Sequence, residues 1–164
     1  MKTVNFEQAK ALGWCWFNDK ELTERLERYA ERKPEWTALD ILRLPSEEVT
    51  DDDKLFVVLC RELIDEKIIH ALACDFAERA LSRAENPHPH SVKAIEVKRR
   101  WIRGEATDEE LSAARDAASS AARDAAGSAA WYAARDAARA RQVAHVIEVL
   151  EGLEDAENER DKFD

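Results

Sequence analysis

The sequence predicts an all-α fold, a single-domain helical bundle around a long alanine-rich helix or helical hairpin. Three observations support this prediction. Residues 113–138 consist of four-residue repeats that each begin with an Ala pair, and Ala has the highest helix propensity. Four Gly and four Pro in 164 residues are too few for a loop-rich β fold. Elsewhere, apolar residues recur at helical spacing behind polar N-cap residues.

The alanine repeats predict a helix that several neighbours approach closely. Four residues advance an α-helix by roughly 400°, so the Ala pairs drift around it by roughly 40° per repeat. An unbroken helix over residues 108–151 would be roughly 66 Å long, against a radius of gyration of ~16 Å for a compact chain of this size. We therefore expect a bend or break, and Gly127-Ser128 is its natural place.

Capping residues, glycines and prolines mark the ends of the other predicted helices. Asn18, Thr50, Ser91 and Thr107 are the expected N-caps, and the last of these begins a capping box with Glu110. The predicted helices cover residues 4–13, 19–32, 36–44, 54–84 with a bend near 64–66, 92–103, and 108 to a stop near Gly152.

An aromatic cluster, Trp14-Cys15-Trp16-Phe17, lies between the first two predicted helices. Two interpretations are open. The cluster could be an exposed anchor for a partner, or it could pack in the core. We favour the core, because a small helical domain depends on large aromatic side chains for buried area.

Cysteine usage and hydropathy indicate a cytoplasmic protein that does not enter a membrane. Cys15, Cys60 and Cys74 are odd in number and irregular in spacing, which favours reduced, mostly buried thiols over a disulfide framework. No apolar run approaches the ~20 residues of a membrane-spanning helix. Charged residues interrupt the short apolar runs of residues 1–13, so this segment does not resemble a signal peptide.

The formal net charge of −10 is concentrated in two segments. Residues 46–90 contain eleven acidic and five basic residues, and residues 142–164 contain eight and two. This charge disfavours direct nucleic-acid binding. It suits a basic protein partner, or mimicry of a nucleic acid, although solubility alone also explains it. The basic run Lys98-Arg99-Arg100 is expected to pair with the acidic middle segment.

The densest acidic cluster is the predicted partner-binding site. Thr50 can cap the following helix, and aspartates in a first turn complement the helix dipole. A Ca²⁺ loop is the weaker alternative, because the cluster lacks spaced ligands, a central Gly and a distal Glu. The predicted partner-binding residues are Glu47, Glu48, Asp51, Asp52 and Asp53.

The sequence suggests no metal site, no cofactor and no catalytic residues. His70 and Cys74 have the i, i+4 spacing of metal ligands, but no second pair completes a zinc site. His88 and His90 lie in a proline-rich segment that reads as a loop. We find no nucleophile–base set and no phosphate loop. We therefore predict that the protein is not an enzyme, with a helical enzyme that assembles distant carboxylates as an alternative.

Three short elements carry a family resemblance. They are Cys74-Asp75-Phe76-Ala77-Glu78-Arg79-Ala80, then Ala94-Ile95-Glu96 with Trp101-Ile102-Arg103-Gly104-Glu105, then the AARDAA repeats. Together they resemble the alanine-rich, immunity-protein-five-like family of bacterial toxin neighbourhoods and phage genomes. The resemblance covers residues 55–150 and implies an all-α protein that binds and neutralises a partner, with no catalytic residues to carry over. Ser119-Ser120 and Gly127-Ser128 depart from the pattern of such arrays.

We therefore predict a cytosolic immunity-type or phage anti-defence protein that binds a protein partner stoichiometrically. The partner would be a basic toxin or a nucleic-acid-binding defence protein. An acidic mimic of nucleic acid is the alternative binding function, and the alanine-lined face would also suit a homodimer. We expect one domain over residues 1–152, followed by a frayed acidic tail over residues 153–164.

Overall fold

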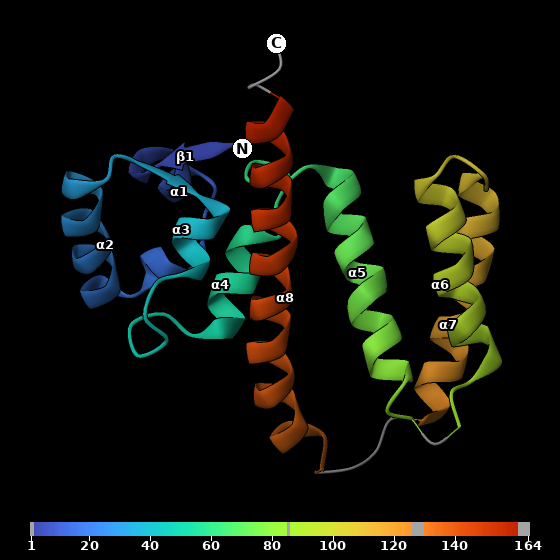
Figure 1. Cartoon of the computed structure of the whole chain (residues 1–164). Helices are drawn as coiled ribbons and strands as arrows, with labels where there is room; N and C mark the ends of the chain where they lie inside the picture. The colour runs from blue at the N-terminus through green and yellow to red at the C-terminus, as the bar shows by residue number, and fades with distance from the viewer. Residues whose placement is uncertain (1, 85, 126–129, 161–164) are drawn as a thin grey trace. The chain divides into compact units, whose positions relative to one another are not determined.

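The computed structural model describes residues 2–84, 86–125 and 130–160, and for residues 120–125, 130–138 and 140 it describes the backbone alone. These residues form eight α-helices, one short 3₁₀ helix and two short strands. The all-α prediction is therefore confirmed. The α-helices are α1 Phe6–Ala11, α2 Lys20–Arg32, α3 Ala38–Leu42, α4 Asp51–Val58, α5 Glu66–Leu81, α6 Pro89–Ile102, α7 Asp108–Ala125 and α8 Ala130–Arg160 (Figure 1).

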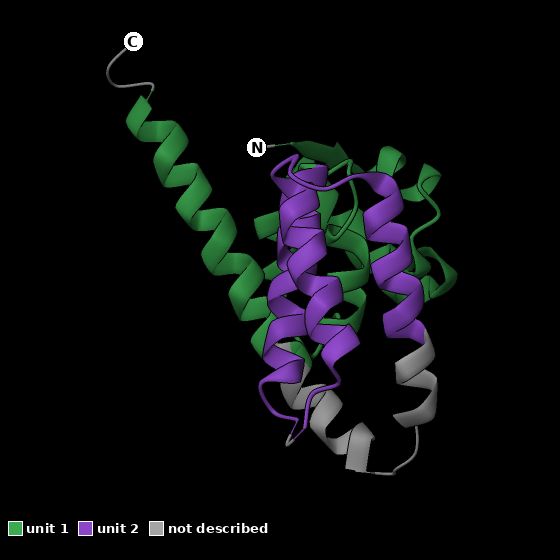
Figure 2. Ribbon diagram, turned by 90° about the vertical axis from the view of Figure 1, so that its right-hand side faces the viewer, with its two compact units in different colours: residues 1–65, 134–164 green, residues 66–133 purple. Residues whose placement is uncertain are grey.

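The chain divides into two compact units, which are coloured separately in Figure 2. Unit 1 comprises residues 1–65 and 134–164, and unit 2 comprises residues 66–133. Unit 1 is thus assembled from both ends of the chain, whereas unit 2 is one continuous segment. The prediction of a single domain over residues 1–152 stays a prediction.

Unit 1 contains a small antiparallel sheet that the sequence analysis missed. Strand β1 (Thr3–Asn5) pairs with β2 (Glu35–Thr37), and Val4 lies opposite Trp36. Both of these central residues are buried. Strands of three residues are too short to show the alternating pattern by which a strand is recognised in sequence.

The ends of the two strands cap the helices that follow them. The Asn5 side chain accepts a hydrogen bond from the backbone of Gln8, and Thr37 accepts one from the backbone of Asp40. A cap residue has extended backbone angles, so it belongs to the strand rather than to the helix. The helices predicted over residues 4–13 and 36–44 therefore begin later, at the first residues of α1 and α3.

The aromatic cluster packs in the core, as predicted. Trp14 and Trp16 are buried, and their ring centroids lie 5.6 Å apart in an edge-to-face arrangement. The buried ring of Trp36 lies 5.7 Å from that of Tyr29. Aromatic pairs of this kind add stability beyond their buried area. The alternative of an exposed anchor is wrong for the two tryptophans of the cluster.

A 3₁₀ helix over Cys15–Asn18 precedes α2. Asp19, and not the predicted Asn18, caps α2, because its carboxylate accepts a hydrogen bond from Leu22 N at 2.9 Å. Asn18 is the last residue of the 3₁₀ helix, whereas Asp19 has the extended backbone that a cap requires.

The helix predicted over residues 54–84 is two helices, α4 and α5. The predicted bend at residues 64–66 is confirmed as a break over residues 59–65, where Leu63 and Ile64 are buried. The capping box of Thr107 and Glu110 is also confirmed, by two reciprocal hydrogen bonds of 2.9 and 3.2 Å. His88, and not the predicted Ser91, caps α6, because Pro89 already supplies the first helical position.

Helix α8 runs through Gly152 to Arg160, so the predicted stop near Gly152 is wrong. Its buried residues Val143, Val146 and Leu150 lie at the spacing of one helical face. Residues 161–164 and the predicted break at Gly127-Ser128 lie outside the described residues, and fraying of the tail stays a prediction.

In unit 2, α6 packs against both α5 and α7 (Figure 1). Gly104 forms the turn between α6 and α7 with φ of +77°, a conformation that glycine adopts without strain. Arg99 of α6 joins α5 through two carboxylates: it lies 2.6 Å from Asp75 and 2.8 Å from Glu78. The expected pairing of the basic run with the acidic middle segment is therefore confirmed for Arg99.

None of the described helices combines the length and the apolar character that a bilayer crossing needs. Cys15, Cys60 and Cys74 are free thiols, as predicted, although only Cys74 is fully buried. Burial raises the pKa of each thiol. A thiol with a raised pKa is mostly protonated at neutral pH and is a weak nucleophile.

The buried face of α8 gives a matched stability test within one helix. Leu150 is 3% exposed, whereas Leu153 is 38% exposed. We expect Leu150→Ala to lower the free energy of unfolding by about 2–4 kcal/mol, because it leaves a cavity. Leu153→Ala should lower it by less than about 1 kcal/mol. Urea unfolding followed by circular dichroism measures both, and equal losses would contradict the assigned burial.

The ion pairs of Arg99 with Asp75 and Glu78 predict a pH-dependent contribution to the free energy of unfolding. The hydrogen bonds of Arg99 lower the pKa of Glu78 in the folded protein. The contribution of Glu78 is complete above its unfolded pKa of about 4.3 and is lost as the pH falls through the lower folded value. We therefore expect Arg99→Met to be destabilising at about pH 7, and its difference from wild type to shrink by about pH 3.5.

Urea unfolding at the two pH values measures this difference. Arg83→Met is the matched control, because Arg83 is exposed just beyond α5. This control should show a small difference at both pH values. If Arg99→Met lowers the free energy of unfolding equally at both pH values, the Arg99 side chain contributes through packing alone.

Candidate functional site

The five predicted partner-binding residues lie in one short stretch of unit 1, the turn before α4 and the first turn of α4. The structure separates them into two groups. Glu47 and Glu48 are exposed in the turn, whereas Asp51, Asp52 and Asp53 are half-buried at the start of the helix.

Asp51 belongs to the environment of a buried lysine. The Lys54 side chain is 2% exposed, and its Nζ lies 3.1 Å from Ser46 Oγ and 3.4 Å from Asp51 Oδ1. Ser46 Oγ in turn donates to Asp51 Oδ1 at 3.1 Å. A buried ammonium is strongly destabilising unless oxygen atoms compensate it. Asp51 and Ser46 supply that compensation, so Asp51 has a structural task.

Asp52 is joined to helix α8. Its Oδ1 lies 2.5 Å from Arg139 Nε, an ion-pair distance without hydrogen-bond alignment. Just after α3, Arg43 Nη2 lies 2.5 Å from Glu151 Oε1 of α8. Two ion pairs therefore connect α8 to the segment that carries the predicted site.

Asp53 completes the cap of α4. Its backbone N–H donates to Thr50 Oγ1 at 3.2 Å, and the Thr50 hydroxyl donates to Asp53 Oδ2 at 2.6 Å. The predicted cap at Thr50 is therefore confirmed. Cys15 Sγ donates to Asp53 Oδ1 at 3.6 Å, and the Asp53 charge adds to burial in raising the pKa of Cys15.

The turn that carries the two glutamates is held in place on both sides. The backbone N–H groups of Glu48 and Val49 both donate to the Pro45 carbonyl at 3.0 Å, and Val49 is buried. Ser46, at the start of the turn, is held by Lys54. The exposed carboxylates of the turn therefore extend from an ordered backbone.

Glu48 also borders a recess of about 220 Å³ in unit 1 whose other polar walls are largely basic. Three arginines at i, i+3 and i+7 of α2 line it, and the sequence analysis did not single them out. Their spacing on one helix face was the available signal. The basic residues of the recess are Arg25, Arg28 and Arg32, and Tyr29 lies among them.

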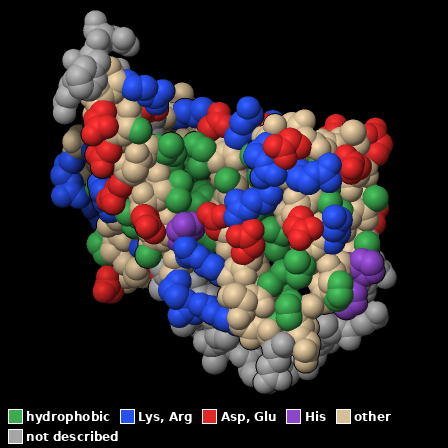
Figure 3. All heavy atoms as spheres, turned by 45° about the vertical axis from the view of Figure 1, so that its right-hand side comes forward, with side chains coloured by type: hydrophobic (Ala, Val, Ile, Leu, Met, Phe, Trp, Pro, Cys, Tyr) green, Lys and Arg blue, Asp and Glu red, His purple; other side chains and the backbone are tan. Residues whose placement is uncertain are grey.

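Charges of both signs are interspersed over the face of the molecule that Figure 3 presents. Hydrophobic side chains appear between them. A mixed surface of this kind favours solubility and creates no strong field of one sign.

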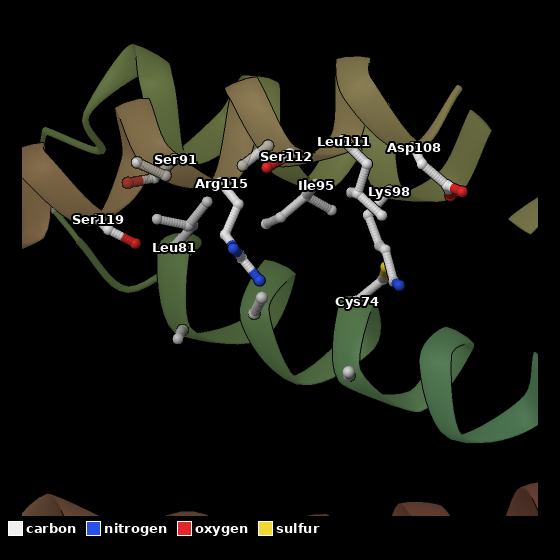
Figure 4. Close-up of a pocket in the computed structure, with 15 residues that line it drawn as sticks. Cys74, Leu81, Ser91, Ile95, Lys98, Asp108, Leu111, Ser112, Arg115 and Ser119 are labelled. Atoms are coloured by element: carbon white, nitrogen blue, oxygen red, sulfur yellow. The ribbon is translucent and has the colours of Figure 1, made fainter. Parts of the chain in front are cut away.

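A second candidate site is a cavity of about 660 Å³ within unit 2 (Figure 4). It lies between α5 on one side and α6 and α7 on the other. Small side chains leave the space open, and only Ala118 among them belongs to the alanine repeats at which the sequence analysis expected close approach. The alanines that line the cavity are Ala73, Ala77, Ala80, Ala94 and Ala118.

Lys98 is the half-buried cation of this cavity. Its Nζ lies 3.9 Å from the centroid of the Trp101 ring, a cation–π contact. Burial lowers the pKa of Lys98. Within the described chain, no carboxylate lies within ion-pair distance of this ammonium. Asp108 lines the cavity as well, but its Oδ1 accepts a hydrogen bond from Trp101 Nε1 at 2.7 Å.

Arg115 and Cys74 also line the cavity, one with a cationic group and the other with a thiol. Figure 4 shows the Arg115 side chain extending from α7 into the cavity, and Cys74 on α5 near Lys98. The Arg115 side chain is 75% exposed, and its Nε lies 3.8 Å from the neighbouring Asp116. It therefore marks the solvent side of the cavity.

The histidines considered as metal ligands have other contacts. The His70 ring lies edge-on to Trp101 with centroids 5.2 Å apart, and His70 Nε2 lies 3.8 Å from a Glu66 oxygen. His88 accepts a hydrogen bond from the backbone of His90. Among the described residues, no three His, Cys, Asp or Glu side chains are grouped to hold a metal ion.

No family model, curated protein or solved structure matches this chain significantly. The resemblance to the immunity-protein family therefore stays a prediction.

The buried lysine predicts a large difference between two Lys→Met substitutions. Lys54→Met removes the ammonium that Asp51 and Ser46 share and leaves the Asp51 carboxylate without its counter-charge. Because the Asp51 side chain is 24% exposed, we expect a loss of about 1–3 kcal/mol, below the range for fully buried pairs. Lys20→Met, at a side chain 92% exposed, should change the free energy of unfolding by less than about 0.5 kcal/mol.

Urea unfolding of the two variants measures these losses. Adding Asp51→Asn to Lys54→Met should recover part of the stability, because the unpaired carboxylate is then neutral. Equal losses for Lys54→Met and Lys20→Met would contradict a structural role for the buried ammonium.

Proposed function

We propose that the protein is a cytoplasmic binding protein that associates stoichiometrically with a basic protein partner and neutralises it, as an immunity or anti-defence protein does. The observation that carries the proposal is the ordered turn with Glu47 and Glu48 exposed beside the acidic start of α4. The carboxylates of this surface are the groups that would meet lysines and arginines of the partner.

Order in the turn supports binding in a specific way. Association is opposed by the entropy lost when loops and side chains become fixed. Here the Pro45 carbonyl and the buried Val49 already fix the backbone of the turn. The partner would therefore find this part of the surface in one conformation, and less of the interaction energy would be spent on ordering it.

The charge balance of the surface supports a basic partner. The five acidic residues of the segment have Lys54 and Arg139 as ion-pair partners, so a net negative charge remains. Opposite charges on two proteins speed their association and make it sensitive to salt. The three aspartates would contribute through their field, since their oxygens already have partners, and the two glutamates would contribute direct contacts.

The arginine-lined recess sets the limit of the proposed surface. Glu48 lies at its border, so the acidic surface extends away from the recess, toward Glu47 and the first turn of α4. We therefore expect Glu47 to contribute more to partner binding than Glu48. An acidic partner would instead be expected to prefer the recess.

Charge reversal of the turn tests the proposal. We expect the variant Glu47→Lys/Glu48→Lys to lose partner capture from host lysate by roughly tenfold or more at low salt. Glu27→Lys/Glu31→Lys on α2 makes the same change in net charge at two exposed positions. This control should capture the partner as wild type does. Quantitative mass spectrometry at low and high salt measures the captured protein and its stoichiometry.

Three outcomes would count against the proposal. These are equal capture by the two variants, capture that high salt does not weaken, and no captured protein from any lysate of a relevant host. Displacement of the captured partner by added DNA would instead identify the acidic surface as a mimic of nucleic acid.

A further inference from the structure

The cavity of unit 2 has the attributes of a site for a small amphipathic ligand. Ligand sites in proteins are concave, mostly apolar and of roughly 300–1,000 Å³. This cavity measures about 660 Å³, and helices α5, α6 and α7 all contribute to its walls. It lies wholly within one compact unit.

The walls favour a hydrocarbon chain over a polar molecule. Ala73, Ala77 and Ala80 form one face of α5, and Ile95 and Leu111 lie on the opposite side. Methyl and aliphatic groups at these positions can remove a hydrocarbon from water but offer it no hydrogen bonds. Along this alanine face a polar ligand would lose its hydration without compensation.

The Lys98 ammonium lies at one end of this mostly apolar space, and the exposed Arg115 side chain enters it between the two ends. In Figure 4, Lys98 and Cys74 lie at one end, and Leu81 and Ser119 lie at the other. The distance along α5 from Cys74 to Leu81 is roughly 10 Å at 1.5 Å per residue. A ligand with an extended chain would therefore place its head group at Lys98 and its tail toward Leu81.

The state of Lys98 identifies the sign of the head group. Its ammonium is half-buried and contacts the Trp101 ring but has no carboxylate partner in the described chain. A carboxylate ligand would supply the missing counter-charge, and charge-assisted hydrogen bonds of this kind are among the stronger polar contacts. The single ammonium of Lys98 matches a single negative charge.

We propose that the cavity between α5, α6 and α7 binds an aliphatic monocarboxylate, with its carboxylate at Lys98 and its chain along the alanine face of α5. This site is separate from the acidic turn of unit 1. The variant Glu47→Lys/Glu48→Lys should therefore bind the carboxylate as wild type does, which keeps the two proposals independent.

Decanoate, below its aggregation concentration, is the probe for an isothermal titration of the full-length protein. We expect saturable binding of one decanoate per chain. Decyltrimethylammonium has a similar chain with the opposite charge and should bind at least roughly tenfold more weakly. Lys98→Met should lower the affinity for decanoate by roughly ten- to a hundredfold, which is the range for loss of a hydrogen bond to a charged group.

Two further variants separate the head-group contact from the apolar site. Lys93→Met, on the same helix at a side chain 62% exposed, is the matched control and should leave decanoate affinity unchanged. Ala77→Phe should fill the cavity and abolish binding of decanoate and of decanol alike. Circular dichroism establishes whether this variant keeps its helices. If it does not, the smaller Ala77→Val should still weaken both ligands.

The proposal is overturned by any of three results. These are the absence of saturable decanoate binding, equal affinity for decanoate and decyltrimethylammonium, and equal effects of the substitutions at Lys98 and Lys93. Decanol binding that Lys98→Met leaves unchanged, together with weakened decanoate, supports it.

Discussion

The buried ammonium of Lys54 constrains the part of unit 1 that carries the candidate partner surface. A charge removed from water must find oxygen atoms, and the chain supplies them from Ser46 on one side and Asp51 on the other. These two residues lie on either side of the turn that contains Glu47 and Glu48. The requirement of one cation for counter-charges therefore fixes both ends of an exposed acidic turn. The buried ammonium therefore acts together with the Pro45 carbonyl and the buried Val49 in ordering this turn.

The two candidate sites use opposite properties of the side chains around them. In the acidic turn and the first turn of α4, the carboxylates outnumber their cationic partners, so this surface retains a negative electrostatic field. In unit 2, side chains are too small to fill the space between three helices, so a cavity remains beside a cation with no carboxylate partner. Interiors are normally packed as densely as organic crystals. Alanine is the commonest residue in the walls of this cavity, and its short side chain leaves space between α5 and the other two helices.

Local rules predicted much of the helical structure, and long-range contacts account for part of what they missed. The caps at Thr50 and Thr107 need partners only three residues away, and both were predictable. Asp52 appeared to be a free surface acid, because its partner Arg139 lies far along the chain. The two strands were missed for the same reason, since each is ordered by the other. The spacing of the alanines indicated helix faces made of small side chains, but it did not show which of these faces would border a cavity.

The connectivity of the two units has a consequence for synthesis. Residues 1–65 share unit 1 with residues 134–164, and the whole of unit 2 lies between them. The ion pairs of Asp52 with Arg139 and of Arg43 with Glu151 cannot form until the last part of the chain has been made. At roughly 5–20 residues per second, the ribosome adds the intervening segment in several seconds. During that time Val143, Val146 and Leu150 do not yet exist, so the nascent N-terminal segment must wait for its final covering helix while the contiguous unit 2 is already complete.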